Sequence, residues 1–154
     1  MIGDAETMRY VGDGETGDLD DAVVQIERMQ LGWAEDGFGR FIVVRKEDGA
    51  PIGRVGLLAW DPAVWQSGVR ARIGDSAEVE LGWTIARSSW GHGYATEAAG
   101  AARDWALAEV RPRRLVSLIH PGNERSLRVA AKLGARLDCW IETYRGIRVQ
   151  LWTY

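Results

Sequence analysis

The sequence predicts one α/β domain in which helices flank a mixed, mostly antiparallel sheet. Three observations predict this fold. The patterned segments follow the order helix, three strands, helix, strand, helix, two strands. A Gly-x-Gly turn at residues 91–93 joins the third strand to an alanine-rich helix. The last two strands flank Arg145-Gly146 and form a hairpin with no helix between them, unlike a doubly wound sheet.

The first half of the chain predicts one helix and three strands. Residues 1–17 are polar and rich in glycine, so we expect an irregular lead-in. Asp18 can cap a helix that runs to about Glu35. A rough helical stripe runs along that helix, formed by Val23, Ile26, Met29, Gln30 and Trp33. Strands are expected at 38–45, 52–60 and 78–86, with a turn at 47–51 and a long loop through Ser76.

The second half predicts two helices and three further strands. The Gly-x-Gly turn opens a helix to about Val110, and residues 115–120 form a short apolar strand. A second helix runs from about Glu124 to Leu133 and ends at Gly134, the residue type that favours a C-terminal cap. Residues 136–144 and 147–154 pair as the terminal hairpin.

Composition excludes several classes of protein. The chain has 154 residues, of which 46% are hydrophobic and 27% charged, typical of one globular domain spanning 1–154. No segment approaches the roughly 20 consecutive apolar residues of a membrane span. The N-terminus lacks the basic and apolar regions of a secretory signal, so we expect a cytoplasmic protein. Cys139 is the only cysteine, which excludes an internal disulfide and a cysteine metal cluster, and we expect no metal.

Charge is divided unevenly along the chain. Residues 1–36 carry ten acidic residues and two arginines, a net of −8, whereas residues 37–154 carry a net of +5. This division can steer an anionic ligand to one side of the molecule. The sequence pI of about 5.4 and the absence of long basic runs argue against nucleic acid as a partner.

The Gly-x-Gly turn predicts an anion site. Glycines at 91 and 93 let the backbone approach a ligand closely, and the N–H groups at the start of the following helix have no helical acceptor. The helix dipole favours an anion there, preferably a phosphate. Neither the third glycine of a dinucleotide-binding fingerprint nor the Gly-Lys-Ser/Thr of a P-loop is present.

Two segments at the right separation carry a family resemblance: WGHGYATEA at 90–98 and N-x-x-S-x-R-V-A-x-K-L-G at 123–134. With MRYVGDG at 8–14, GAPIGRVGL at 49–57 and YRG at 144–146, the chain resembles the GNAT N-acetyltransferase superfamily, and within it the ribosomal-protein N-terminal (RimJ/RimL-like) branch. The resemblance implies acetyl-CoA as cosubstrate and a primary amine as acceptor. It also implies a sheet splayed between two parallel strands, those at 78–86 and 115–120.

The resemblance also implies roles for individual residues. The cofactor-binding residues fall in three groups. Main-chain donors to the pyrophosphate are Gly91, His92, Gly93, Tyr94 and Ala95. The strand that pairs with the pantetheine arm includes Trp83, Thr84 and Ile85. Asn123 orders the end of that arm, and Ser126 lies near the thioester sulfur.

The chain departs from the family pattern at three places. Where the superfamily has Gln or Arg, three residues before the first glycine, this chain has Ser88, with Arg87 beside it as the expected cofactor-binding residue. Where many members carry a tyrosine general acid there is Ala130, so Ser126 takes that role by default. The strand and helix that usually precede the segment at 8–14 are not found in this sequence, so either the sequence is truncated or the sheet lacks its first strand; an unfilled sheet edge would invite a homodimer.

Acetyl transfer to an amine needs a base to remove the ammonium proton. Glu78 and Glu80 alternate on one strand and share a face, so both are candidates, as is an ordered water; a merely solvated sheet face is the alternative. We favour Glu80, which precedes the cofactor strand, with Glu78 second. Two functions follow as hypotheses: an N-acetyltransferase acting on a protein N-terminus or a small amine, or a non-catalytic acyl-CoA-binding module.

Overall fold

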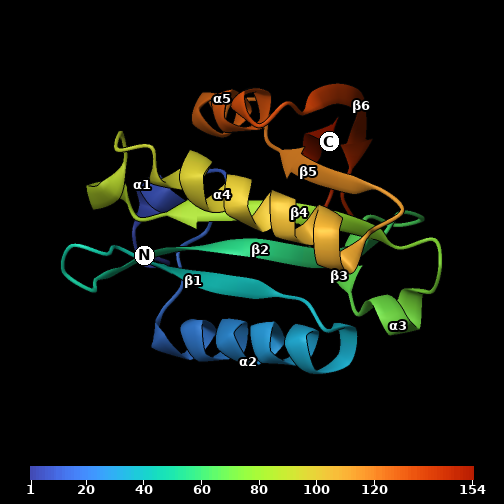
Figure 1. The fold of residues 1–154 in the computed structure, drawn as a ribbon, viewed down its shortest axis with the longest axis horizontal. Helices are drawn as coiled ribbons and strands as arrows, with labels where there is room; N and C mark the ends of the chain where they lie inside the picture. Colours follow the sequence, from blue (N-terminus) through green and yellow to red (C-terminus); the bar gives the residue numbers. More distant parts are fainter.

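A seven-stranded sheet forms the centre of the molecule, which a computed structural model describes over residues 1–154 (Figure 1). The strands are β1 (Arg40–Val44), β2 (Pro51–Asp61), β3 (Gln66–Gly68), β4 (Glu78–Ile85), β5 (Leu115–Ile119), β6 (Arg136–Glu142) and β7 (Arg148–Thr153). Their order is β1-β2-β4-β5-β7-β6, with the short β3 beside β2. Every pair is antiparallel except β4 with β5, so the predicted mixed, mostly antiparallel sheet is confirmed.

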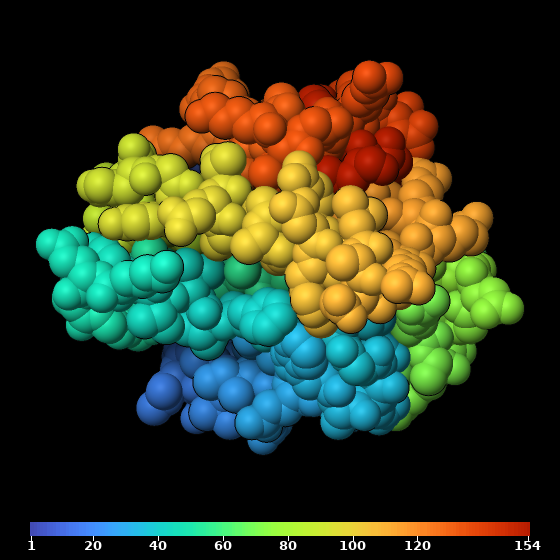
Figure 2. Space-filling view, viewed as in Figure 1, coloured from blue at the N-terminus to red at the C-terminus, as the bar shows by residue number.

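Five α-helices surround this sheet: α1 (Ala5–Met8), α2 (Leu19–Asp36), α3 (Arg70–Ile73), α4 (Tyr94–Trp105) and α5 (Glu124–Lys132). A 3-10 turn, η1 (Arg87–Ser89), precedes α4, and one π-helical turn, η2 (Ala106–Val110), extends it. In Figure 1, α4 lies in front of the sheet and α1 behind it. Figure 2 shows the same face, with α4 (yellow) between α2 (blue) and α5 (orange). No helix is both long enough and apolar enough to cross a membrane.

The predicted elements are all present, and three short ones are additional. The lead-in contains α1, which Asp4 caps, and the long loop after β2 contains β3 and α3. Each of these has only three or four residues, too few for a hydrophobic period to be visible.

Helix α2 forms where it is predicted but does not bury the predicted stripe. Asp18 and Asp21 form a reciprocal capping box, and Gly37 ends the helix in the left-handed conformation. No residue of α2 is buried, and both Val23 and Ile26 are exposed. The helix therefore depends on its caps and on a few contacts at its C-terminal half rather than on a buried face.

The main core lies between the sheet and α4. Ala99, Ala102 and Ala106 pack against buried side chains of β2 and β4, including Leu57 and Leu81. Alanine side chains let the helix approach the sheet closely, which fixes the turn at its start against the end of β4. The core thereby positions the Gly-x-Gly segment.

The parallel pair β4–β5 is short. Its register contains only Val79 opposite Leu115 and Glu80 opposite Val116, after which the two strands separate. The rest of β4 pairs only with β2, and the rest of β5 only with β7. The predicted splay is therefore confirmed, and it begins just after Glu80.

Candidate acetyl-CoA and acceptor site

The turn before α4 presents a row of unpaired backbone donors. Gly91 and Gly93 have φ values of 82° and 83°, which side chains rarely adopt, and a Cβ at either position would meet no protein atom within 4 Å. The N–H groups of residues 91–96 donate to no acceptor in the chain, and no side chain caps α4. This row at a helix N-terminus suits a phosphate, as the sequence predicts. The imidazole of His92 stacks on the ring of Tyr94, with the ring centroids 5.5 Å apart.

The separated edge of β4 presents further backbone groups. Val79 donates its N–H toward β5 and Ala86 donates its N–H toward β2, so by alternation the backbone groups of Trp83 and Ile85 face the gap. The indole Nε1 of Trp90 already donates to the carbonyl of Ile85, at 2.7 Å. Thr84 is paired with Arg54, so its backbone faces β2 and only its neighbours offer groups to a ligand in the gap.

Two side chains occupy the position where the β4–β5 ladder would otherwise continue. The next ladder bond would join the N–H of Leu118 to the carbonyl of Leu81. Instead, the hydroxyl of Ser117 donates to that carbonyl at 2.6 Å, and the N–H of Leu118 donates to the carboxylate of Glu80. Both backbone groups are therefore satisfied without the strands closing.

Glu80 lies at the apex of this gap. The residue is 9% exposed, and its Oε2 accepts a 2.7 Å hydrogen bond from Nε1 of Trp60. Burial raises the pKa of Glu80, although the positive charge of Arg40 and the bond from Trp60 act in the opposite direction. A carboxylate with a raised pKa beside an open strand edge is suited to accept a proton.

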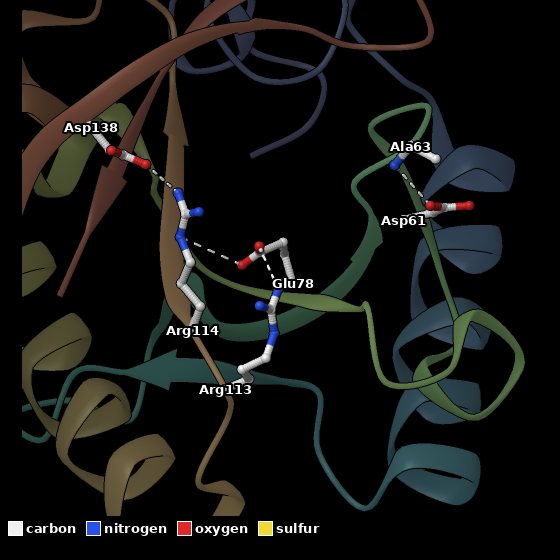
Figure 3. A network of polar contacts seen from close by, with 6 residues as sticks. All are labelled: Asp61, Ala63, Glu78, Arg113, Arg114 and Asp138. Carbon is white, nitrogen blue, oxygen red and sulfur yellow. Dashed lines mark hydrogen bonds and ion pairs between the residues drawn. The ribbon is translucent and has the colours of Figure 1, made fainter.

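Glu78 is placed differently, although it is on the same face of β4. Its side chain is 4% exposed, and its carboxylate pairs with Arg113 at 3.3 Å and Arg114 at 3.7 Å (Figure 3). Arg114 also pairs with Asp138 of β6. Oε2 of Glu78 has no hydrogen-bond partner. This network joins the starts of β4 and β5 to β6, and it holds the closed end of the parallel pair.

Asn123 and Ser126 open α5 beside the gap. The side chain of Asn123 caps the helix by accepting from the N–H of Ser126 at 3.1 Å, which leaves the amide nitrogen of Asn123 available. The hydroxyl of Ser126 is half-buried and makes no hydrogen bond within the chain. Both side chains therefore have free donors at the start of α5.

Two hydroxyl groups, those of Tyr154 and Ser117, lie close together under α5. The phenol oxygen of Tyr154 is 3.0 Å from Oγ of Ser117, and burial raises the pKa of Tyr154 to about 12. Because Ser117 donates to Leu81, the phenol is the donor in this pair. The ring of Tyr154 packs in the small cluster that contains Ala130, the position where many relatives are expected to place a tyrosine.

The mouth of the gap is bordered by Arg125 and Trp90. The guanidinium of Arg125 lies 4.0 Å above the ring of Trp90 and connects α5 to the turn. On the other face, the N–H of Arg87 donates to Thr7 of the N-terminal segment, and Tyr10 stacks on His120 at 4.9 Å. The N-terminal segment thus crosses from the end of β4 to the end of β5, opposite α4.

Three residues act on Glu80 in the structure but were not predicted from the sequence to do so: Arg40, Arg54 and Trp60. Arg54 carried a visible signal, because it is a single charge within the apolar strand GRVGL. Arg40 and Trp60 come close to Glu80 only through the pairing of β1, β2 and β4, which the local pattern does not contain.

A family model describes this arrangement. The model for the acetyltransferase (GNAT) domain matches residues 1–136. The chain belongs to the GNAT acetyltransferase family. Residues 1–136 of this GNAT domain include the turn, the splay and α5, but not the hairpin β6–β7.

Similar proteins and structures are consistent with that membership. This GNAT domain is 35% identical over 102 residues to the uncharacterized protein YkkB of Bacillus subtilis, covering 65% of the chain and 53% of YkkB. The chain thus spans about half the length of that relative. A crystal structure of an acetyltransferase from Agrobacterium tumefaciens is 27% identical, with a TM-score of 0.72 over 97% of this chain and 81% of that one. A putative acetyltransferase of Salmonella typhimurium, yncA, solved with acetyl-CoA, is 16% identical, with a TM-score of 0.67 over 97% of this chain and 83% of that one.

Proposed function

We propose that this GNAT domain transfers the acetyl group of acetyl-CoA to a primary amine, by direct attack in a ternary complex. The observation that carries the proposal is the alignment of three features along β4. Unpaired N–H groups lie beyond its C-terminal end, free backbone groups of Trp83 lie along its edge, and a buried carboxylate lies at the apex of the gap. The acetyl-CoA bound by the Salmonella relative supports the identity of the donor.

The residues divide the binding of the donor between them. The N–H groups of residues 91–95 hold the pyrophosphate, with the α4 dipole behind them. Trp83 pairs with the amides of the pantetheine arm, which runs along β4 toward Leu81. Asn123 donates from its free amide nitrogen to the end of that arm. Ile85 lies four residue steps from Leu81 along β4, a distance of about 13 Å, and an arm that spans this distance carries the thioester to the apex beside Glu80.

Glu80 then acts on the acceptor. Its carboxylate takes a proton from the ammonium group, directly or through one water, so that the nitrogen lone pair is free to attack the acetyl carbonyl carbon. A carbon–nitrogen bond forms, the carbon–sulfur bond breaks, and the electron pair of that bond leaves on sulfur. The hydroxyl of Ser126 donates a hydrogen bond or a proton to the departing sulfur.

The motif resemblance to the RimJ/RimL-like branch supports a protein N-terminus as one class of acceptor, and small-molecule amines are the other. A screen that measures coenzyme A release with N-terminal peptides and with free amines separates the two classes. The proposal expects turnover with at least one class. Tight acetyl-CoA binding without turnover against the whole screen overturns it in favour of a non-catalytic acyl-CoA-binding module.

The position of β1 supports a further part of the proposal, that two copies pair as a homodimer. The indole of Trp33 on α2 donates to the carbonyl of Arg40 at 3.1 Å, so the part of the outer edge proposed for pairing is the part beyond Arg40. β1 is the terminal strand of the sheet, and Ile42 and Val44 on it are exposed. Sedimentation velocity tests this pairing, and a monomer at every accessible concentration contradicts it.

A further inference from the structure

Two arginines project from the same face of the sheet as Glu80. Phe41 of β1 packs against Trp105 of α4, and Val55 of β2 and Leu81 of β4 belong to the core under α4. Since alternate residues of a strand face opposite sides, Arg40, Arg54 and Glu80 all face away from α4. The register places Arg40 beside Gly56 and Gly82, and Arg54 beside Thr84.

These guanidinium groups have no carboxylate partner. Arg54 is 7% exposed, and its only side-chain hydrogen bond is to the neutral amide of Gln25 on α2. Arg40 makes no side-chain hydrogen bond, and no carboxylate lies within 4 Å of either group. Buried charges in proteins are normally paired, so two guanidinium groups facing one more distant carboxylate leave one positive charge in excess.

The ionisation of these groups reflects the same imbalance. Burial lowers the pKa of Arg54 to about 10, and repulsion from Arg40 acts in the same direction. Burial also lowers the pKa of Arg40, while the charge of Glu80 opposes that effect. With a pKa of about 10, Arg54 remains charged near neutral pH, and an anion bound between the two arginines would relieve the repulsion between them.

Glycines keep the surface between the arginines and Glu80 free of side chains. Gly56 and Gly82 lie between Arg40 and Glu80 in the register, and a Cβ at Gly82 would lie 3.7 Å from Oε1 of Glu80. Gly82 and Arg40 are partly exposed. At Gly56 the missing side chain lets the backbone of Gly39 and Arg40 approach β2 closely, since a Cβ there would lie 2.4 Å from the carbonyl oxygen of Gly39. Gly82 therefore provides the part of this face where a small ligand would contact the backbone of β4.

We propose that Arg40 and Arg54 bind a carboxylate on the acceptor, so that the acceptor is an amine that also carries a carboxylate, such as a free amino acid. This inference rests on the proposed function, because it assigns the acceptor of the same reaction. The ammonium group of such a molecule faces Glu80 while its carboxylate faces the arginines. Each end meets the opposite charge, and the excess positive charge on this face is neutralised.

The test compares matched pairs of amines that differ only in the carboxylate: glycine with glycinamide, β-alanine with β-alaninamide, and 4-aminobutyrate with 4-aminobutanamide. Coenzyme A release is measured at saturating acetyl-CoA. We expect kcat/KM to be about 10- to 100-fold higher for the acid of at least one pair, the range of a charged hydrogen-bonded contact. Turnover of amines with no preference for the acid in any pair overturns this inference and leaves the proposed function standing.

Substitution localises the preference. Arg54→Gln and Arg40→Gln should each bring the ratio of kcat/KM for the preferred acid to kcat/KM for its amide close to one. The ratio is the readout because both arginines also lower the pKa of Glu80, so their removal affects the turnover of both substrates. Arg136→Gln, which removes the same charge from an exposed position on β6, should retain the preference. If both arginine variants lower acid and amide equally, their role is structural and the inference is wrong.

Because Arg54 is buried, a binding measurement on the unsubstituted chain complements the variants. Calorimetry in the presence of coenzyme A should show N-acetylglycine, or the N-acetyl form of another preferred acid, binding more tightly than the corresponding amide. Equal binding of the two overturns the inference without reference to turnover. Preferential binding of the acid without turnover of any amine supports the carboxylate subsite and overturns the proposed function instead.

Discussion

Trp60 of β2 donates its indole N–H to Oε2 of Glu80 on β4, at 2.7 Å, and so fixes one oxygen of a buried carboxylate at the apex of the splay. The register places Trp60 opposite Glu78 rather than opposite Glu80, so the indole reaches diagonally across the two strands. Diagonal neighbours of this kind are within reach of aromatic side chains. The carboxylate is therefore oriented by a residue that does not itself face the cofactor edge.

Replacement of Trp60 by phenylalanine removes this bond and keeps an aromatic ring. The bond favours the charged carboxylate, so its loss raises the pKa of Glu80 further. We expect kcat at neutral pH to fall by roughly 10-fold and to recover partly at higher pH, since a hydrogen bond to a charged group is worth about 1.5–3 kcal/mol. Trp140→Phe on the exposed strand β6 is the control. An unchanged pH–rate profile in Trp60→Phe would show that this bond does not set the ionisation of the base.

Glu80→Gln tests the base itself. We expect kcat to fall by roughly 10²–10⁴-fold, the usual range for a general base, with partial rescue at high pH because more acceptor is already neutral. Acetyl-CoA affinity should stay within a few-fold. Glu78→Gln should affect kcat far less and instead lower the unfolding free energy, by about 1–3 kcal/mol, because its carboxylate pairs with Arg113 and Arg114. Full activity of Glu80→Gln at pH 7 moves the base to Glu78 or to water.

The same carboxylate makes stability depend on pH. Burial raises the pKa of Glu80 in the folded state, so the unfolded chain loses this proton at a lower pH than the folded chain. The stability contributed by the protonated group is complete below the unfolded pKa and is lost as the pH rises through the folded pKa. Glutamine does not ionise, so the Glu80→Gln variant does not show this loss of stability with rising pH. The unfolding temperature of the variant relative to the original chain should therefore rise between pH 4 and pH 8, and a constant difference contradicts the assignment.

Gly93→Val tests the phosphate cradle against a matched control. Gly93 and Gly37 have φ values of 83° and 70°, and a Cβ at either would meet no protein atom within 4 Å. Valine at either position therefore imposes similar backbone strain. Both variants should lose stability, but only Gly93→Val should lose measurable acetyl-CoA binding by calorimetry. Unchanged affinity in folded Gly93→Val removes the turn from the binding site.

Ser126→Ala separates protonation of the leaving group from deprotonation of the acceptor. The hydroxyl has no partner within the chain, so its removal should leave the fold and acetyl-CoA affinity nearly unchanged. We expect a lower kcat that high pH does not rescue, because the loss concerns the departing sulfur. Recovery of kcat at high pH would instead place Ser126 on the acceptor side.

The order of elements and the turn geometry could be predicted from the sequence because they follow from local signals. Asp18, Gly37, Gly93 and Gly134 act within one turn of a helix, and their caps form as local chemistry dictates. The exposure of Val23 and Ile26 on α2 could not be predicted, because apolar residues at helical spacing indicate a helix but not whether another element of the fold covers them. The partners of Glu80 were equally hidden, since Trp60, Arg40 and Leu118 reach it only through strand register and the ending of a ladder.

The side-chain bridges of Ser117 and Glu80 have a thermodynamic consequence for ligand association. They satisfy the last backbone groups of β4 and β5 in the free chain, so the two strands are already apart before any ligand arrives. At the edge of β4 an incoming chain of amides then meets the free backbone groups of Trp83 and the carbonyl of Ile85, which already accepts from Trp90. None of its association free energy goes into breaking strand–strand hydrogen bonds, and little conformational entropy is lost by the protein. If the ligand had to separate β4 from β5, that step would weaken binding; in this protein the two strands are separated when the chain folds.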